Sequence, residues 1–326
     1  MLSLDVEAFC SPQAFDDVAP LWRAAWSRLT ERSPFLSYEW HANWWMHLGE
    51  GSPEIVVVRD GGDAPAVAPF VRLTDGTLTL SGGDFTDVLD LIAPAGSALA
   101  PIAAYLKERA SAIELRYVPT GGTAQHALPA LLRDAGFAVE LAPLVVSPRV
   151  ALPSSFDEYL ARLSKKDRHE LRRKMRRLER AGTVQYAVAS PARWEEALSG
   201  FVALHRQAPG EKGTFLTPKL ERFFRAVARA GAQAGWLRLG ELSLDGEPIA
   251  VLFALEQDGV LQAYNSAVDP RTLALSPGVL LHAYAIRDAI GRGLRIYDFL
   301  RGGEPYKYDL GGRDLVLWRL SARRPA

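Results

Sequence analysis

Two kinds of hydrophobic spacing alternate along this chain of 326 residues. Apolar residues recur every three or four positions in 13–29 and 279–290, which is typical of amphipathic helices. Short runs rich in valine, leucine and aromatic residues, such as 54–59, 66–73 and 112–118, are typical of strands. The pattern therefore predicts an α/β protein.

Turn residues separate the predicted strands. Asp245-Gly246 lies between strands 236–244 and 247–256, and Asp258-Gly259 precedes a strand over 260–267. Asp-Gly between apolar runs favours tight hairpin turns, because their twist matches that of paired strands. Residues 60–63 predict a similar turn in the first half, and 137–150 read as strands broken by Pro143 and Pro148.

Hairpins followed by alternating strands and helices occur in the first half of the chain and again in the second. The length suits two domains of ordinary size. We therefore expect an N-terminal domain over 1–153, degenerate in its site, and a C-terminal domain over 154–326. The tryptophans of 38–45 have helical spacing, which favours a place in the core over a role in stacking a substrate.

The most informative stretch is 264–312. A predicted strand ends near Asn265 and Ser266, and a helix follows after a loop, with Ser276 as its N-cap and Pro277 in its first turn. The helix stops near Gly291, and a strand is predicted over 294–300. In this order of elements, unpaired backbone N–H groups and the helix dipole face an anion such as a pyrophosphate.

This order of strand, phosphate-facing helix and strand resembles the GNAT acyltransferases. The segments SKKDRHELRRKMRRLERAG, DGEPIAVLFALEQDG and YDFLRGGEPYKYDLGG resemble the branch of CelD/BcsL-like acetyltransferases, which is related to the FemABX aminoacyl transferases. Ser276-Pro277-Gly278 stands where the usual signature has Gln or Arg before a glycine-rich turn.

The resemblance implies a tandem GNAT-like fold, with two mixed sheets flanked by helices. It also implies an N-acyltransferase that uses acetyl-CoA or another acyl-CoA and needs no metal. The acceptor would be an amine of a small molecule, an amino sugar or a peptide, in polysaccharide or cell-envelope biosynthesis. The residues expected to contact the acyl-CoA are Asn265, Ser266, Ala267, Ser276, Pro277, Gly278, Val279 and Arg301.

Polar residues at the end of the last predicted strand are candidates for catalysis, since ligands bind at the carboxyl ends of strands in open α/β sheets. Glu304 or Asp298 would be the base or anchor for the amine, and Tyr306 the proton donor to the leaving group. Lys307 matches in position a lysine that Fem-type enzymes carry before a glycine turn. The expected substrate contacts are Asp87, His205 and Tyr308.

Some of these residues have a structural alternative. Asp298 can pair with Arg295 or Arg301, and Tyr306 can simply pack. His205 at a predicted helix end is more often a cap or a core hydrogen bonder than a catalyst. Asp87, in a glycine-and-aspartate loop, can orient an amine or sugar hydroxyl, or can serve only to cap that loop.

Basic residues gather in one predicted helix, 164–181, on which positions 165–180 carry more cations than neighbouring acids can neutralise. Such a helix can grip phosphates of tRNA, CoA or a nucleotide sugar, or can be a solvated face. It keeps open a second hypothesis, an aminoacyl-tRNA-dependent transferase of the Fem type. A third hypothesis is a non-catalytic accessory protein of polysaccharide synthesis.

Composition narrows the setting. Lys plus Arg and Asp plus Glu both number 38, so no global field attracts nucleic acid or membrane. The single cysteine, Cys10, cannot form an internal disulfide or a cysteine-ligated metal site. The start of the chain does not resemble a secretory signal, and no run suits membrane insertion, so we expect a cytoplasmic protein. Motifs of serine hydrolases, zinc proteases and P-loops are absent.

Overall fold

The computed structural model describes residues 5–59, 65–95, 97 and 99–325, so the predicted turn at 60–63 lies outside the described residues. The chain forms two compact units, Met1–Val146 with Leu315–Ala326, and Ser147–Asp314. It passes from unit 1 to unit 2 within one long strand and returns within another. The expected boundary at 153 and this division therefore differ in position, and the C-terminal strand belongs to unit 1.

The elements of the first half of the chain follow one another in the order strand, two helices, three strands, helix, strand, helices, strand. They are β1 (Asp5–Phe9), α1 (Ala14–Ser27), η1 (Pro34–Leu36), α2 (Tyr38–Leu48), β2 (Ser52–Arg59), β3 (Ala66–Arg72), β4 (Leu78–Leu80), η2 (Gly83–Phe85), α3 (Ala100–Arg109), β5 (Ala112–Pro119), α4 (Thr123–His126), α5 (Leu128–Asp134) and β6 (Ala138–Ala151).

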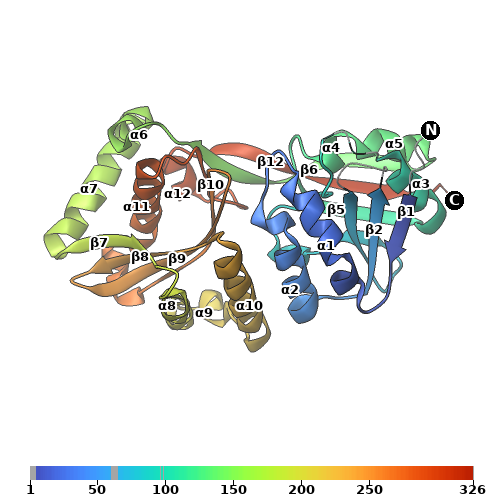
Figure 1. Ribbon diagram of the computed structural model, residues 1–326. Coiled ribbons are helices and arrows are strands. Elements are labelled where there is room, and N and C mark those ends of the chain that lie inside the picture. Colours follow the sequence, from blue (N-terminus) through green and yellow to red (C-terminus); the bar gives the residue numbers. More distant parts are fainter. Residues whose placement is uncertain (1–4, 60–64, 96, 98, 326) are drawn as a thin grey trace. The chain divides into compact units, whose positions relative to one another are not determined.

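After two further helices, the second half follows a similar order, with three helices after its first strand and one before its last. The elements are α6 (Phe156–Arg162), α7 (Lys165–Ala181), β7 (Val184–Val188), α8 (Trp194–Gln207), α9 (Glu211–Phe215), α10 (Pro218–Ala234), β8 (Leu237–Leu244), β9 (Glu247–Gln257), β10 (Val260–Val268), η3 (Pro270–Leu275), α11 (Pro277–Gly291), β11 (Ile296–Asp298), α12 (Pro305–Asp309) and β12 (Arg313–Arg323). Figure 1 shows both sets.

The strands join in the order β1-β2-β3-β4-β5-β12-β6-β11-β10-β9-β8-β7. The pairs β4–β5 and β10–β11 are parallel, whereas the hairpins β2–β3, β8–β9 and β9–β10 are antiparallel, so the sheet is mixed. The prediction of an α/β fold with mixed sheets and flanking helices is confirmed. The two sets of strands share one order because β6 and β12 each run through both units.

Unit 1 buries alternate residues of its strands on opposite faces, as the two-residue repeat of a strand requires. Val56 and Val58 pack with residues of α3 and α5, whereas Ile55 and Val57 pack with residues of α1. Of the tryptophans in 38–45, Trp40 and Trp44 are buried, which confirms their predicted place in the core, whereas Trp45 is half-buried.

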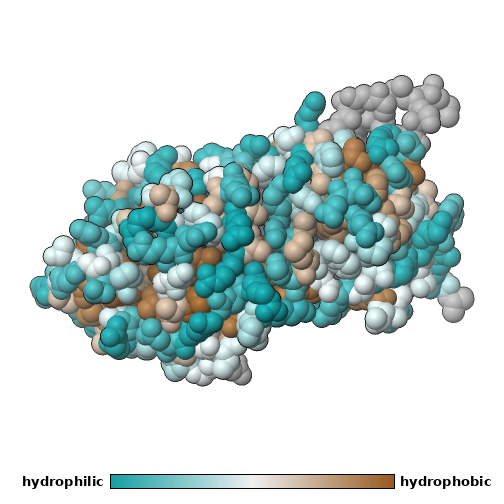
Figure 2. All heavy atoms as spheres, turned by 60° about the horizontal axis from the view of Figure 1, so that its bottom comes forward, coloured by the Kyte–Doolittle hydropathy of each residue, from teal (hydrophilic) through white to brown (hydrophobic). Residues whose placement is uncertain are grey.

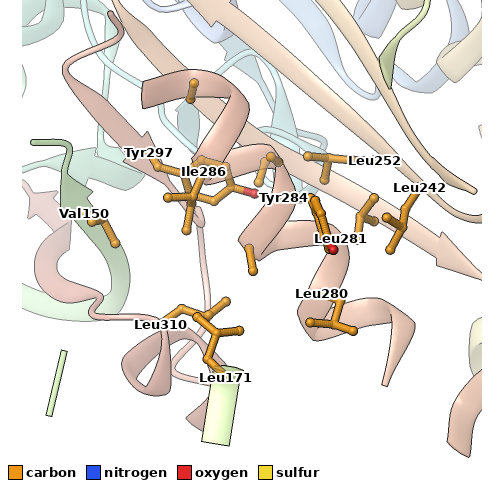
Figure 3. Packing of buried hydrophobic residues seen from close by; sticks show 14 of the residues in the cluster. Val150, Leu171, Leu242, Leu252, Leu280, Leu281, Tyr284, Ile286, Tyr297 and Leu310 are labelled. Atoms are coloured by element: carbon orange, nitrogen blue, oxygen red, sulfur yellow. The ribbon is translucent and has the colours of Figure 1, made fainter. Parts of the chain in front are cut away.

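Unit 2 follows the same rule on β9. Leu252 and Ala254 pack in one cluster with residues of α11, while Phe253 meets the ring of Phe201 on α8, with centroids 5.9 Å apart. Figure 3 shows Leu281 and Tyr284 of α11 on the side of Leu242 and Leu252. The central strand is therefore covered on both faces, and α11 is fixed on one of them.

The two Asp-Gly hairpin turns have the predicted geometry. Asp245 and Gly246 have φ of 52° and 85°, and Asp258 and Gly259 have φ of 48° and 75°. Positive φ at both central residues is the property of the tight turn that Asp-Gly favours. These turns set the register of β8, β9 and β10.

Three predicted boundaries were wrong. Residues 138–151 form one strand despite Pro143 and Pro148, since proline removes only a donor, and the Pro148 carbonyl still accepts from the Phe299 N–H at 2.9 Å. The polar, glycine-containing stretch 208–214 has the composition of a loop, but it contains most of α9. The last predicted strand, 294–300, is reduced to Ile296–Asp298.

The surface is mixed in character. Figure 2 shows hydrophobic patches interrupted by hydrophilic residues on the face in view. Large apolar side chains that are clearly exposed belong to separate elements, among them Met46 on α2 and Leu273 on η3. No helix in the described part of the chain is both long and apolar enough to cross a membrane.

His41 gives unit 1 a predicted pH dependence. Its imidazole is fully buried, contacts the Ser81 hydroxyl through Nδ1 at 2.7 Å, and has a pKa lowered to about 3 by burial. In the unfolded chain the His41 imidazole takes up a proton near pH 6.5, whereas in the folded chain it does so only near pH 3. Stability is therefore fully present above pH 6.5 and is lost as pH falls toward 3, by on the order of 4 kcal/mol.

We expect His41→Phe, which keeps a ring at this position, to remove that slope. Urea unfolding of both proteins between pH 7 and pH 4 measures it. Asp90, buried with a pKa raised to about 6 by burial, has the opposite slope, but it is common to both proteins and cancels in the difference. A difference between the two proteins that stays constant with pH would contradict the prediction.

Candidate functional site

The strands β10 and β11 separate at the centre of unit 2. They are paired in parallel from Val260–Ile296 to Gln262–Asp298, and β11 ends there while β10 continues to Val268. In the ladders that the structure describes, the rest of β10 pairs only with β9. In the described ladders, the separation leaves one edge of the end of β10 without a paired strand.

A β-bulge interrupts β10 at this point. Its register against β9 shifts between Ala263 and Asn265. A bulge bends a strand and re-aims the groups that follow it. Asn265, Ser266 and Ala267, the residues expected to polarise an acyl carbonyl, come directly after the bulge on the open part of β10.

The helix α11 starts beside the end of β10. Ser276 occupies the predicted N-cap position, but it has φ of 59° and its side chain makes no capping hydrogen bond. The first N–H groups of a helix have no partner within the helix. A Cβ placed on Gly278 would meet Val268 Cγ1 at 3.6 Å, an ordinary contact. Gly278 and Val279 therefore present a helix start that lacks a side-chain cap.

Asp298 is fully buried where β11 ends. Its Oδ2 accepts from Arg149 Nε at 2.7 Å, and its Oδ1 accepts from Ser147 Oγ at 2.9 Å and from the Leu300 N–H at 2.8 Å. Arg149 faces Asp298 across the β6–β11 ladder. The carboxylate fixes the chain as it leaves the sheet, and its expected alternative partners, Arg295 and Arg301, do not take that place.

Lys307 holds the same loop from the other side. Its side chain is almost fully buried, and Nζ donates to the carbonyls of Leu300 at 3.0 Å, Arg301 at 2.7 Å and Gly302 at 3.0 Å. Glu304 Oε2 lies 2.9 Å from the same nitrogen. Leu300 has φ of 60°, a strained conformation for a residue with a side chain. Lys307 compensates for that strain by donating hydrogen bonds to the carbonyls of Leu300 and the two residues that follow it.

Tyr306 lies against the helix that starts at the open edge. Its ring stacks on His282 of α11 with centroids 5.2 Å apart, and His282 Nδ1 is 2.7 Å from the Tyr297 hydroxyl. Gly278 and His282 are one helical turn apart on α11. Burial, together with the charge of Glu304, raises the pKa of Tyr306 to about 12. The phenol is therefore protonated at neutral pH.

The remaining candidates are dispersed. The Tyr308 hydroxyl donates to Asp314 Oδ1 at 2.8 Å, and Arg301 is half-buried on the loop that Lys307 holds. His205 is 1% exposed and lies near the rings of Phe201 and Phe215, so it belongs to an aromatic cluster of α8 and α9. Asp87 is buried in unit 1, apart from the other residues along the chain.

Sequence reasoning missed the partners that hold the site. Arg149 and Ser147 lie about half the chain away from Asp298, and only the β6–β11 pairing brings them to it. His282 was hidden among the apolar residues of its helix, where nothing in the spacing distinguishes it. No group of three or more His, Cys, Asp or Glu residues within the described ranges could hold a metal ion.

The predicted basic helix is α7. It carries nine basic and three acidic residues, in a chain of net charge zero. Its apolar stripe of Leu171, Met175 and Leu178 is buried in the core of unit 2, so the basic side chains point outward. In the described part of the chain, the basic residues of α7 that form no ion pair include Lys165, Lys166, Arg172, Arg176, Arg177 and Arg180.

We expect Lys307→Met to destabilise the protein by roughly 3 kcal/mol, because three buried carbonyls lose their donor. Glu304→Gln should cost about 0.5 kcal/mol or less, since the Glu304 side chain is 55% exposed and solvent screens the pair. Urea unfolding measures both, with Lys219→Met on the exposed face of α10 as a control. Equal effects of Lys307→Met and Lys219→Met would show that Lys307 does not hold the loop.

A comparison with known protein families finds a match within unit 2. The family model of the acetyltransferase (GNAT) domain matches residues 165–308, which lie within unit 2. A search of curated proteins found no match.

Three solved structures have a similar fold. FemX superposes with a TM-score of 0.64 at 12% identity, over 96% of each chain. The C-terminal domain of a putative lysylphosphatidylglycerol synthetase from Agrobacterium fabrum gives 0.56 at 11% identity, over 93% of this chain and 91% of that one. A tandem GNAT protein of the clavulanic acid biosynthesis pathway gives 0.50 at 12% identity, over 99% and 100%. The chain thus has the α/β fold of Fem-like and tandem GNAT proteins, and residues 165–308 match a GNAT acetyltransferase domain.

Proposed function

We propose that this protein is an N-acyltransferase, in which unit 2 transfers an acyl group from acyl-CoA to an amine. The observation that carries the proposal is the parting of β10 from β11 beside the start of α11, within the stretch that matches the GNAT domain. This places an open strand edge next to a helix start that no side chain caps. An acyl thioester and a pyrophosphate are groups that such an arrangement suits.

The donor binds, in this proposal, through backbone groups. The N–H groups at Gly278 and Val279 receive phosphate oxygens, and the missing side chain of Gly278 lets the anion approach the helix. Successive N–H groups of a strand point to opposite edges, so those among Asn265, Ser266 and Ala267 that do not pair with β9 point to the other edge of β10. They donate to the carbonyl oxygen of the thioester and stabilise the negative charge that develops there.

The reaction requires one bond to form and one to break. The neutral amine attacks the thioester carbonyl carbon, a C–N bond forms and the C–S bond breaks. The proton that the amine loses passes to Glu304 and on to solvent, from which Tyr306 regains the proton that it gives to the leaving group. The leaving thiolate takes up a proton, which the Tyr306 phenol supplies, since its pKa of about 12 keeps it protonated. Glu304 is exposed at the start of α12 and is the carboxylate available to anchor the amine.

Asp298 and Lys307 serve this site as positioning residues. Both are buried and saturated with hydrogen bonds, and they fix the loop from Phe299 to Gly302 from its two ends. The half-buried Arg301 on that loop is then held as a contact for phosphate or carboxylate. His205 packs within its aromatic cluster and the Tyr308 hydroxyl is bonded to Asp314, so in this proposal both help to define the shape of unit 2 around the site.

The wider setting follows from the sequence segments that resemble the CelD-type branch. We infer an acceptor that is an amino sugar, a peptide or another small amine, in polysaccharide or cell-envelope synthesis. Unit 1 is then a degenerate copy of the same fold. The protein acts in the cytoplasm in this proposal.

A second candidate donor is aminoacyl-tRNA, and the basic face of α7 favours it. Unpaired arginines on one exposed face are suited to a phosphate backbone, because guanidinium groups bind phosphate in a bidentate manner. The apolar stripe of α7 is already buried in its own core, so insertion into a lipid surface has no apolar face to use.

The donor site can be tested by substituting Gly278. The chain has room for a Cβ at this position, so Gly278→Ala and Gly278→Phe should both fold. Wild type should show a rise in Tm with acetyl-CoA, because a ligand of the folded state stabilises it by mass action. We expect Gly278→Phe to abolish that rise, since its ring lies where the pyrophosphate binds.

Gly291→Ala, at the other end of α11, is the matched control, because no atom lies within 4 Å of an added Cβ there. Release of free thiol from acetyl-CoA in the presence of amino sugars and peptides measures turnover. Unchanged stabilisation of Gly278→Phe by acetyl-CoA would reject the helix site. No stabilisation of wild type by any acyl-CoA would reject the donor itself and favour an accessory protein.

The second donor is tested on α7. Replacing Arg172, Arg176 and Arg180 by Gln should weaken binding of aminoacyl-tRNA at least tenfold and reduce its dependence on salt concentration, because fewer counterions are released. The control replaces Arg222 and Arg229 on the exposed face of α10. Equal weakening in both variants would remove α7 as a specific contact and leave only general charge attraction.

A further inference from the structure

Unit 1 has a pocket of its own, which the proposed acyl transfer does not use. Its volume is about 750 Å³, within the range of small-molecule sites. Its polar lining comes in part from β4, β5 and β12 and includes Thr79, Arg116 and Arg319. Apolar side chains from α2 and the loop after β4, including Leu48, Phe85 and Leu89, also line it. The pocket is therefore amphipathic.

One residue that lines the pocket has a strained backbone conformation. This residue, Tyr117, has φ of 60°, a rare conformation for an aromatic residue, and its hydroxyl donates to Asp84 Oδ1 at 2.7 Å. Arg116 Nη1 donates to the same oxygen at 2.8 Å. Gly83, with φ of 54°, lies close to the ring of Trp44. Strained residues of this kind persist where the surrounding contacts hold them, and they gather at binding sites.

The acids of the pocket are largely engaged within unit 1. Asp84 accepts from Arg116 and Tyr117, as above. Glu114 Oε2 accepts from Ser321 Oγ at 2.6 Å, and Asp75 Oδ1 accepts from the Thr77 N–H at 2.9 Å. Glu50 lies on the rim, exposed. The hydrogen-bonding capacity of the inner carboxylates is thus partly used before a ligand arrives.

The guanidinium groups of Arg319 and Arg323 keep hydrogen-bonding capacity for a ligand. Arg319 reaches Glu140 only at 3.5 Å and Glu114 only at 3.9 Å, beyond the usual length of a charge-assisted hydrogen bond. Arg323 forms no ion pair within 4 Å in the part of the chain that the structure describes. They lie four residues apart, with Ser321 midway between them, at positions that share one face of a regular strand. Both line the pocket.

We propose that this pocket binds an amphipathic organic acid, whose carboxylate or phosphate is held by Arg319 and Arg323 and whose apolar body lies against Leu48, Phe85 and Leu89. The forked guanidinium groups suit a planar carboxylate or a phosphate equally. Unit 1 is then a ligand-binding unit even though it lacks the match to the acetyltransferase domain.

The test uses the full-length protein and matched ligands. Titration calorimetry would compare N-acetyl-Leu-Phe with its C-terminal amide, which has the same apolar body without the charge. Phenyl phosphate and inorganic phosphate distinguish a phosphate ligand from a carboxylate ligand. The variants are Arg319→Gln and Arg323→Gln, with Arg133→Gln on the exposed surface of α5 as the control.

We expect one of the acids to bind at least about tenfold more tightly than the amide, and each pocket variant to lose about tenfold, as removal of one charge-assisted contact predicts. The Arg133 variant should bind like wild type. Circular dichroism melts confirm that each variant is folded. Equal binding of acid and amide, no binding of any acid at millimolar concentration, or equal loss in the Arg133 variant would each overturn the proposal. None of these outcomes depends on whether unit 2 uses acyl-CoA.

Discussion

A carboxylate buried without a partner is too costly for a folded protein to keep, and Asp298 satisfies this constraint with Arg149, Ser147 and the Leu300 N–H. These bonds fix the point at which β11 leaves the sheet. Because β11 stops there while β10 continues, the open edge of β10 depends on this one carboxylate. Lys307 extends the arrangement, since its ammonium binds the next three carbonyls of the same loop.

The proposed chemistry of unit 2 consequently relies on backbone groups more than on reactive side chains. The bulge in β10 and the start of α11 supply N–H groups, and buried ionic residues hold the loop beside them without facing a substrate. This division suits transfer from a thioester, which is already reactive and needs charge stabilisation and orientation. It also explains why an acid such as Asp298 can be essential for geometry without acting as a base.

The two units have a similar order of elements but differ in what they offer. Unit 2 combines an open strand edge with a helix of 15 residues that starts without a side-chain cap. In unit 1 the corresponding strands β4 and β5 share a single described pair, Leu78–Ile113, and the polar face beside them carries a pocket instead. Two units with a similar order of elements therefore present different surfaces.

The sequence by itself determined the class of fold, the hairpins of β8 to β10, the helix α11 and the basic helix α7, because each depends on spacing within a few residues or on local turn chemistry. Asp245-Gly246 and Asp258-Gly259 adopt the positive φ values that their residue types favour. Only the tertiary structure decided which polar residues became structural. Asp298 meets Arg149 and Ser147 through a ladder between distant strands, and Arg319 reaches the pocket of unit 1 because the last strand pairs with β5. Such pairings join residues far apart along the chain, and no local pattern of hydrophobic and polar positions encodes them.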